Sequence, residues 1–372
     1  MKLSPFFLVL AVAPLSAQNT GLQLDHGVDE HVDVPYDPLL IPQSGLTVEA
    51  WIRYDESAVT TGSYHWPTVL RQNPAPGQET YFLRVGAAAS ANRFLDFKIA
   101  TASGGSTASY SFAPGELSTW THVAGTYDGT MVRLFVNGVE AATAPGNGQP
   151  LVDNGGPLRI GNGDLTVAGA ETWAGEIDEV RVWPFARSAA EILQTRDDML
   201  AGLPGGVVSF NLDGHYVDTS SGLQGTPAGT PTFAVTTPLV PWGSSAGSYG
   251  SSTGNCEQLR SAIGSKPVVP FADFTARCVR APKSSAGFFL VGLTGYATPF
   301  RVLGVDVFVD LASVVVAAPI QSDGLGAARV KVGIDDDPML IGTTVFTQFM
   351  FLDPVCGPEG FVSSDALSVT IL

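Results

Sequence analysis

The chain has little charge and few residues of the kinds that bind metals or act as nucleophiles. Charged residues make up 15% of its 372 residues, against about 25% in an average soluble protein, and only 3 Cys and 5 His are present. Basic residues are the scarcer charged group, with 19 Lys+Arg against 35 Asp+Glu and a net charge of -16. Nucleic acids and anionic membranes are bound through clustered positive charge, so this composition argues against both as partners. Cations and neutral ligands remain compatible with it.

Long hydrophobic runs are also missing. After Gln18 no apolar stretch approaches the ~20 residues that a membrane-spanning helix needs, so no membrane span is predicted. Before it, Lys2 precedes an apolar run over residues 6–13, and residues 15–17 end on small side chains. This pattern predicts a signal peptide over residues 1–17. We therefore expect the protein to be secreted or associated with the cell surface.

Cysteine is confined to the last third of the chain, at Cys256, Cys278 and Cys356. The spacing contains no C-x-x-C pair and the histidines are scattered, so neither a zinc site nor a catalytic Cys–His pair is predicted. In an exported chain, three cysteines can form one disulfide bond and leave one thiol. The sequence leaves all three pairings open.

Glycine and proline, by contrast, are abundant, with 42 Gly and 26 Pro, a composition that favours strands joined by turns. Within residues 120–142, Asp128-Gly129 and Asn137-Gly138 each separate two alternating apolar runs by two residues. Such dipeptides supply the positive φ angles of a type I′ hairpin. The segment is therefore predicted to be a three-stranded antiparallel meander.

Alternating side chains predict further strands at residues 46–52, 158–160 and 175–183. A helix is predicted next, because Ser188 and Glu191 have the spacing of a capping box, in which each side chain binds the other's backbone N–H. The capping box stands ahead of the apolar residues Ile192, Leu193 and Met199.

Four of these segments resemble, in order and residue type, the LamG-like jelly-roll family of the concanavalin A-like lectin/glucanase superfamily. They read LTVEAWI, WTHVAGTYDGTMVRLFVNGVEAA, PLRIGNG and WAGEIDEVRVWPFARSAAEI. The opening QLDHGVDEHVDVP resembles the family's first strand, with His26 where a glycine is usual. The resemblance implies an all-β fold in which residues 18–200 form a jelly-roll sandwich of two antiparallel sheets.

The remaining chain is predicted to add strands and a second domain. Residues 201–242 either complete the jelly roll or begin a degenerate second copy, and residues 243–266 are rich in Gly and Ser, as in a linker. Residues 267–372 alternate again, which predicts a second, smaller β-sandwich. The segments DGLGAARVKVG and SSDALSVTIL are similar to C-terminal modules of exported proteins from planctomycete-type bacteria.

One motif resembles a catalytic sequence. Laminarinase-type glycoside hydrolases of the superfamily place two catalytic glutamates around an aspartate, as E-x-D-x-E or E-x-D-x-x-E. Here Glu176 and Asp178 fit the pattern, but Val180 and Arg181 occupy the positions of the second glutamate. In a regular strand Glu179 points to the opposite face, so the carboxylate pair of a retaining enzyme is not expected. No catalytic residue is predicted.

A structural calcium ion is the one cofactor that the resemblance implies. Alternation predicts that Asp178 faces inward with Val180 and Val182, where an unpaired carboxylate is costly. Members of the superfamily often bind calcium between the first strand and this late strand, so Asp25 and Asp178 are the candidate ligands. In the alternative, Asp178 accepts backbone hydrogen bonds and Asp25 caps a turn.

The candidate ligand-binding residues are Tyr64, His65 and Trp66, which follow the predicted strand at 46–52. Aromatic side chains on loops stack on sugar rings in many lectin-like modules, and packing within the loop is the alternative. The predicted function is that of an exported, non-catalytic protein that binds a glycan or an extracellular or cell-surface protein. The alternatives are a glycoside hydrolase or polysaccharide lyase on the same fold, and a purely structural cell-surface protein.

Overall fold

The computed structural model describes most of the chain beyond the predicted signal peptide. The described residues are 20–26, 28–58, 66–73, 75, 77–86, 93–163, 171–200, 207–218, 220–235, 240–242, 246–254, 256, 258–263, 266–324 and 326–372. The predicted signal peptide and two of the candidate ligand-binding residues, Tyr64 and His65, lie outside them.

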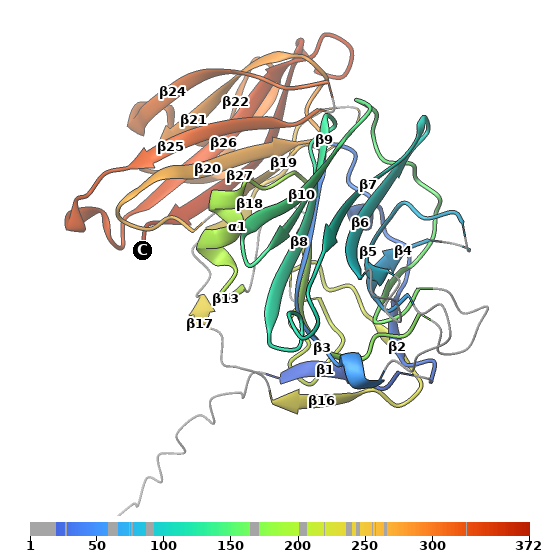
Figure 1. Ribbon diagram of the computed structural model, residues 1–372. Coiled ribbons are helices and arrows are strands. Elements are labelled where there is room, and N and C mark those ends of the chain that lie inside the picture. Colours follow the sequence, from blue (N-terminus) through green and yellow to red (C-terminus); the bar gives the residue numbers. More distant parts are fainter. Residues whose placement is uncertain are drawn as a thin grey trace, which may run out of the picture.

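The N-terminal half forms a sandwich of two antiparallel sheets, which confirms the predicted jelly roll (Figure 1). Sheet A has the order β10-β9-β8-β3-β12-β1-β16, with β14 paired to β12, and sheet B has the order β15-β2-β11-β4-β5-β6-β7. The strands of sheet A are β1 (Thr20–Leu24), β3 (Leu46–Tyr54), β8 (Thr121–Tyr127), β9 (Met131–Val136), β10 (Val139–Pro145), β12 (Gly175–Trp183), β14 (Val208–Phe210) and β16 (Thr232–Val235). Those of sheet B are β2 (His31–Val34), β4 (Thr68–Gln72), β5 (Tyr81–Gly86), β6 (Phe94–Thr101), β7 (Gly104–Ser111), β11 (Leu158–Ile160) and β15 (Thr226–Ala228).

The hydrophobic core lies between these sheets and follows the alternation of the strands. In β3, for example, Val48, Ala50 and Ile52 are fully buried in this core. The two sheets approach closely at Gly125 of β8, where an added Cβ would lie 2.2 Å from the ring of Phe97. A glycine is required there because any side chain would overlap the ring.

The predicted meander is formed by β8, β9 and β10, and its two turns differ. Asn137 and Gly138 have φ angles of 51° and 77° and form the two-residue turn that the sequence predicts. The Asp128 turn has three residues between the strands, and only Gly129 has a positive φ, at 88°. It differs because the Asp128 carboxylate accepts hydrogen bonds from the backbone N–H groups of Thr130 and Met131.

The predicted helix is α1 (Ala189–Thr195), and its capping box is present. Ser188 accepts from the backbone of Glu191, whose carboxylate accepts from the backbone of Ser188. The other helical segments are the 3-10 turns η1 (Pro38–Leu40), η2 (Glu56–Ala58), η3 (Leu311–Ser313) and η4 (Pro338–Leu340). All the helices that the structure describes are too short to span a bilayer.

The segment after the helix belongs to both sheets. Strands β14 and β16 pair with β12 and β1 in sheet A, and β15 pairs with β2 in sheet B. Two short strands, β13 (Asp198–Leu200) and β17 (Val240–Trp242), pair in parallel beside them.

The predicted Gly/Ser linker at residues 243–266 is wrong where the structure describes it, because two strands lie within it. β18 (Ala246–Tyr249) pairs with β27, and β19 (Arg260–Ile263) pairs with β20. Ala246 is buried, and the Tyr249 ring meets Phe308 and Phe346 edge-on. The Gly and Ser residues around these strands are typical of a flexible linker. Here their small side chains allow close pairing with a neighbouring strand.

The C-terminal region is a second β-sandwich, as predicted. A five-stranded sheet contains β18, β21 (Ala286–Gly292), β24 (Val314–Gln321), β26 (Thr344–Leu352) and β27 (Phe361–Thr370). A three-stranded sheet contains β19, β20 (Phe271–Val279) and β25 (Ala328–Ile334), and a hairpin is formed by β22 (Gly295–Val302) and β23 (Val305–Val309). Of the three open pairings, the disulfide bond joins Cys256 to Cys356, and the Cys278 thiol is buried.

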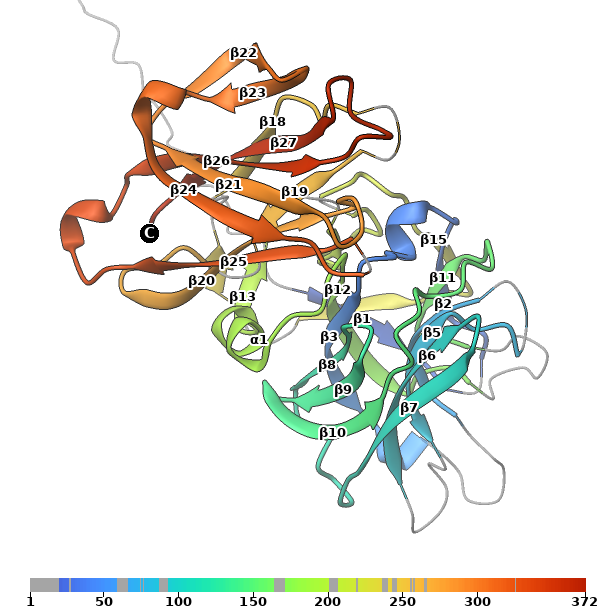
Figure 2. The same cartoon turned by 90° about the horizontal axis from the view of Figure 1, so that it is seen from above.

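The two sandwiches share a hydrophobic cluster. Trp183 and Phe185, at the end of β12, pack in one cluster with Phe274, Leu367 and other residues of the C-terminal sheets. Both views place α1 between sheet A and the C-terminal sheets (Figures 1 and 2). The outer face of sheet A is therefore covered, whereas sheet B lies on the far side of the jelly roll.

Candidate functional site

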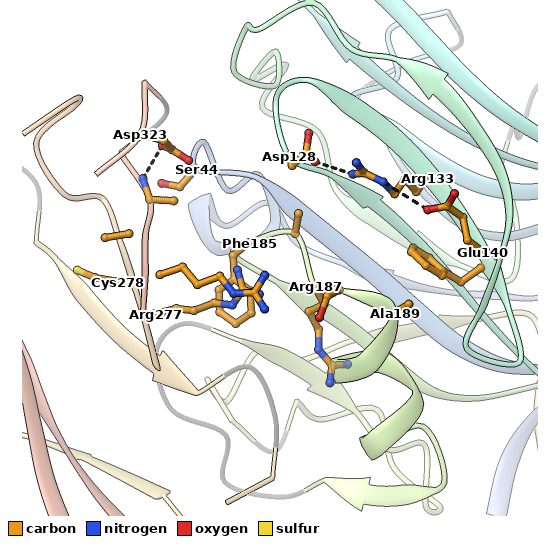
Figure 3. Close-up of a pocket in the computed structure, with 16 residues that line it drawn as sticks. Ser44, Asp128, Arg133, Glu140, Phe185, Arg187, Ala189, Arg277, Cys278 and Asp323 are labelled. Atoms are coloured by element: carbon orange, nitrogen blue, oxygen red, sulfur yellow. Dashed lines mark hydrogen bonds and ion pairs between the residues drawn. The ribbon is translucent and has the colours of Figure 1, made fainter. Parts of the chain in front are cut away.

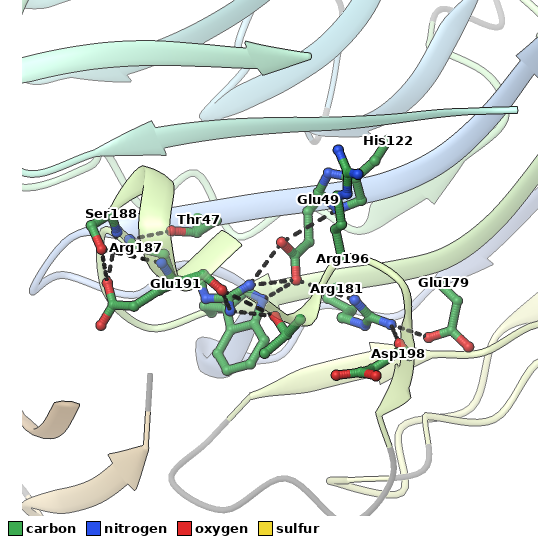
Figure 4. Close-up of polar contacts among 12 residues, drawn as sticks. Thr47, Glu49, His122, Glu179, Arg181, Arg187, Ser188, Glu191, Arg196 and Asp198 are labelled. Atoms are coloured by element: carbon green, nitrogen blue, oxygen red, sulfur yellow. Dashed lines mark hydrogen bonds and ion pairs between the residues drawn. The ribbon is translucent and has the colours of Figure 1, made fainter. Parts of the chain in front are cut away.

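Charged side chains are buried on the outer face of sheet A, beneath α1 (Figure 4). Glu49 of β3 accepts hydrogen bonds from Arg187, at 2.9 and 3.0 Å, and from the indole of Trp183, at 2.7 Å. Arg181 lies 3.4 Å from Glu49 and 2.5 Å from Glu179. These four charged side chains are fully buried, so the cluster joins strands to one another and is closed to ligands.

The pKa values of the two carboxylates in this cluster, Glu49 and Glu179, are shifted in opposite directions. Burial acts to raise the pKa of Glu49, but Arg187, His122 and Arg181 outweigh it and hold that pKa well below its usual range. Burial raises the pKa of Glu179 to about 7. Arg181 acts to lower this pKa but does not offset the burial, because it is shared with Glu49. Burial also lowers the pKa of His122, whose Nε2 lies 3.6 Å from Glu49.

The catalytic-like motif on β12 is interrupted by a β-bulge. Asp178 pairs with Trp51 and Arg181 pairs with Glu49. Two residues of β12, Glu179 and Val180, therefore lie opposite the single residue Ala50 of β3. Glu179 has a φ of 50°. The prediction that Asp178 shares a face with Val180 is therefore wrong, because the bulge reverses the alternation at this point. Both Glu179 and Asp178 belong to the covered outer face.

Each carboxylate of this motif is bound by another group of the protein. Glu176 forms an ion pair with Arg53, and Asp178 accepts a hydrogen bond of 2.8 Å from the backbone of Glu179. Glu179 is held by Arg181 and has no exposed surface. A substrate cannot reach Glu179 in this arrangement.

The residues predicted to bind calcium are not brought together. Leu24 pairs with Gly175, so Asp25 lies beyond the end of β1 while Asp178 lies on the other side of that pair, four residue positions or about 13 Å away along the strands. Asp25 is exposed and Asp178 is buried. Across the described ranges, no group of three or more Asp, Glu, His or Cys is arranged to hold a metal ion. Asp25 and Asp178 therefore do not fit the calcium site that the resemblance implies.

The outer face of sheet B contains the third candidate ligand-binding residue, Trp66. This side chain is half-buried, and the Arg84 guanidinium of β5 lies over its ring at 4.5 Å. The same guanidinium lies 4.2 Å from the ring of Phe82, and Lys98 of β6 lies 5.6 Å from that ring. Aromatic and cationic groups thus alternate from Trp66 across β5 to β6.

Ion pairs extend this arrangement along the sheet. Arg71 of β4 donates to Glu171, at 2.7 Å, and to Glu79, which is also 3.6 Å from Lys98. Arg159 of β11 continues the row by donating to Asp33, at 2.8 Å. Arg84, Lys98 and Asp33 keep 20%, 33% and 39% of their side-chain surface exposed. This face therefore presents hydrogen-bonding groups of both signs to solvent, together with the half-buried ring of Trp66.

A cavity of about 410 Å³ lies between the jelly roll and the C-terminal sandwich (Figure 3). Its walls come from β9 and β10, from the segment between β12 and α1, and from β20 and β25. Arg133, Arg187, Arg277 and Arg329 all line it. Sequence reasoning missed this cavity because its arginines come from segments far apart in the chain, and no local motif marks them.

Comparison with known proteins agrees with the fold. A family model described as the concanavalin A-like lectin/glucanases superfamily matches residues 26–193, a little under half of the chain. Pappalysin-1 of mouse and of human are 26% and 27% identical to this chain over 165 residues, which are 42% of this chain and 10% of those proteins. The chain thus spans about a tenth of the length of the curated relatives that it matches.

Solved structures resemble the chain at low identity. A Bacteroides ovatus protein proposed to bind carbohydrate has 20% identity and a TM-score of 0.46, covering 60% of this chain and 62% of that one. A SAP-like pentraxin from Limulus polyphemus has 15% identity and a TM-score of 0.37, covering 48% and 82%. The CBM40 of a Ruminococcus gnavus sialidase, bound to α2,3 sialyllactose, has 16% identity and a TM-score of 0.36, covering 46% and 94%.

Proposed function

We propose that this protein is exported, that it is not an enzyme, and that it binds carbohydrate on the outer face of sheet B. The observation that carries the proposal is the half-buried ring of Trp66, stacked on Arg84 beside the ion pairs of Arg71; Phe82, on the other side of Arg84, is 3% exposed and supports the stack from below. A sugar offers an apolar ring face and a rim of hydroxyl groups. The aromatic ring of Trp66 next to paired carboxylates and guanidinium groups matches both parts of it.

The charge of this face favours a neutral sugar. Four cationic side chains lie on it, and each is paired with a carboxylate or stacked on a ring. These are Arg71, Arg84, Lys98 and Arg159, and the four carboxylates around them are Asp33, Glu79, Glu171 and Asp96, the last directly across from Arg84 on β6. Because the charges are already balanced within the sheet, a charged ligand would gain little, whereas hydroxyl groups can bind to donors and acceptors alike.

Two features support export. The predicted signal peptide directs the chain out of the cytoplasm, and the disulfide bond between Cys256 and Cys356 is of the kind that forms in oxidising compartments. A glycan of a matrix or of a cell surface is then the natural partner of the face.

The test is a glycan array probed with the full chain, followed by titration calorimetry with the best neutral glycan. We expect Trp66→Ala to weaken binding about fivefold, because a ring contact contributes roughly 1 kcal/mol. Trp120→Ala is the matched control, since Trp120 is also half-buried but directly precedes β8 of sheet A. If no glycan binds, or if folded Trp66→Ala binds as the unaltered chain does, the proposal is wrong.

A further inference from the structure

The cavity between the two sandwiches, named here the interdomain groove, has the size and position of a ligand site. Its volume of about 410 Å³ lies within the ~300–1,000 Å³ range of small-molecule pockets, which occur preferentially at domain interfaces. Arg329 is one-third exposed and Glu140 about half exposed, so the groove is open to solvent. Phe135 and Phe185 line it as well.

Two guanidinium groups at the C-terminal side of the groove are only partly used by the protein. Both hydrogen bonds of Arg277 to Glu191, at 2.7 and 2.8 Å, come from its Nη2 atom, and its buried Nε has no hydrogen-bond partner among the described residues. Arg329 likewise uses Nη2 for Thr275, at 3.4 Å, and lies 3.6 Å from Glu191. Arg277 is 6% exposed and rests on the ring of Phe185, so its position is fixed.

These two arginines share one acidic partner, which leaves positive charge at this end of the groove. Glu191 is the carboxylate that pairs with both. Burial and the nearby Arg329 and Arg187 lower the pKa of Arg277 to about 10 against the effect of Glu191, as expected where cations are crowded. A planar carboxylate could accept two N–H groups from such a guanidinium fork.

The opposite end of the groove is acidic (Figure 3). There Arg133 lies between Asp128, at 2.5 Å, and Glu140, at 3.4 Å, whereas Asp323 lines the groove on the same side as Arg277 and Cys278. The carboxylates of Asp128 and Glu140 would repel a second negative charge, whereas they can accept hydrogen bonds from hydroxyl groups. The groove therefore favours a ligand with one anionic end and a neutral, hydroxyl-rich remainder.

We propose that the interdomain groove is a second binding site, which takes a sugar carrying a single carboxylate, such as a hexuronate. The carboxylate binds Arg277 and Arg329, and the hydroxyl groups face Asp128 and Glu140. This site is separate from the face around Trp66 and does not depend on it.

The test is titration calorimetry of the full chain with D-galacturonate, D-galactose and inorganic sulfate. We expect D-galacturonate to bind at least tenfold more tightly than D-galactose or sulfate, and Arg329→Gln to abolish that preference. Arg329 is partly exposed, so its removal should leave the fold intact, and an unchanged melting temperature verifies this. Arg301→Gln, which changes an exposed arginine of β22 outside the groove, is the matched control and should bind as the unaltered chain does.

Three results would overturn the proposal. They are equal affinity for D-galacturonate and D-galactose, binding of sulfate as tight as that of D-galacturonate, and an unchanged preference in folded Arg329→Gln. Trp66→Ala distinguishes the two sites, because it should leave D-galacturonate binding intact whether or not the sheet B face binds a neutral glycan.

Discussion

On the outer face of sheet A, Glu49 meets Arg181 and Arg187, and on the outer face of sheet B, Glu79 and Glu171 meet Arg71. The residue types are the same. The side chains on sheet A have no exposed surface, because α1 and the C-terminal sandwich cover them, whereas Glu79 and Glu171 keep 11% and 12%. The same residue types are thus fully enclosed on one face, whereas on the other the carboxylates reach solvent and only Arg71, at 3%, is buried.

The difference teaches that burial decides the role of a charged pair in this fold. A fully buried carboxylate must be compensated by its neighbours at all times, so it has no capacity left for a ligand. A pair at the surface can exchange one of its hydrogen bonds for a ligand at little cost. Three substitutions would break or sharpen this comparison.

Glu49→Gln should have the largest effect. It leaves Arg181 and Arg187 buried with less negative charge, and removing one partner of a buried pair typically costs about 3–5 kcal/mol of unfolding free energy. The matched change on sheet B, Glu79→Gln, should cost about 1 kcal/mol or less, because Arg71 keeps Glu171. Urea denaturation of both variants measures the two losses. Equal losses would show that burial does not separate the two faces.

Glu191→Gln should remove a contribution to the free energy of unfolding that is present at neutral pH and lost in acid. Burial acts to raise the pKa of Glu191, but Arg277, Ser188 and Arg329 lower it to about 2. A carboxylate with a depressed pKa stabilises the fold above its unfolded pKa of about 4.5, and this stability is lost as the pH falls toward 2. Between pH 6 and pH 2 the unaltered chain should lose about 3 kcal/mol more than Glu191→Gln.

Thermal melts or urea titrations across this pH range provide the measurement. Asp197→Asn is a suitable control, because Asp197 follows α1 but its side chain is 60% exposed. Parallel stability curves for the unaltered chain and Glu191→Gln would contradict the assignment of this acid sensitivity to Glu191.

Glu179→Gln should act in the opposite direction and more weakly. Its pKa is raised to about 7, so the carboxyl group stabilises the fold while it is protonated, and this stability is lost as the pH rises from about 4.5 through 7. The unaltered chain should lose about 2 kcal/mol relative to Glu179→Gln between pH 5 and pH 7. Urea denaturation at several pH values tests this, and a constant difference between the two proteins would refute it.

The local features of the jelly roll were predictable because short-range chemistry sets them. Asn137-Gly138 forms its turn because two successive positive φ angles suit these residues, and Ser188 with Glu191 starts a helix because their side chains bind each other's backbone. The strands at 158–160 and 175–183 are found where alternation places them.

Other features depend on partners from distant segments. The bulge at Glu179 requires a positive φ that this residue type disfavours, and it is accompanied by contacts to Arg181 and Asp178. The bulge leaves Asp178 on the outer face of sheet A, so the prediction from alternation that Asp178 faces inward with Val180 is wrong. Similarly, the Gly/Ser-rich segment at 243–266 includes strand β18 because the edge of β27 pairs with it.

The sequence by itself determined the positions of most strands and one capped helix, because each rests on neighbours a few residues apart, and its resemblance to the LamG-like family implied the two-sheet jelly roll. Only the tertiary structure decided which cysteines pair, which face of the jelly roll is covered, and that Arg277 and Arg329 of the C-terminal sandwich meet Glu191 of the jelly-roll helix. The physical reason is that burial and charge pairing are set by whatever packs against a strand. In this chain, that partner lies a hundred or so residues away, as the separations of 100 between the bonded cysteines and 86 between Glu191 and Arg277 show.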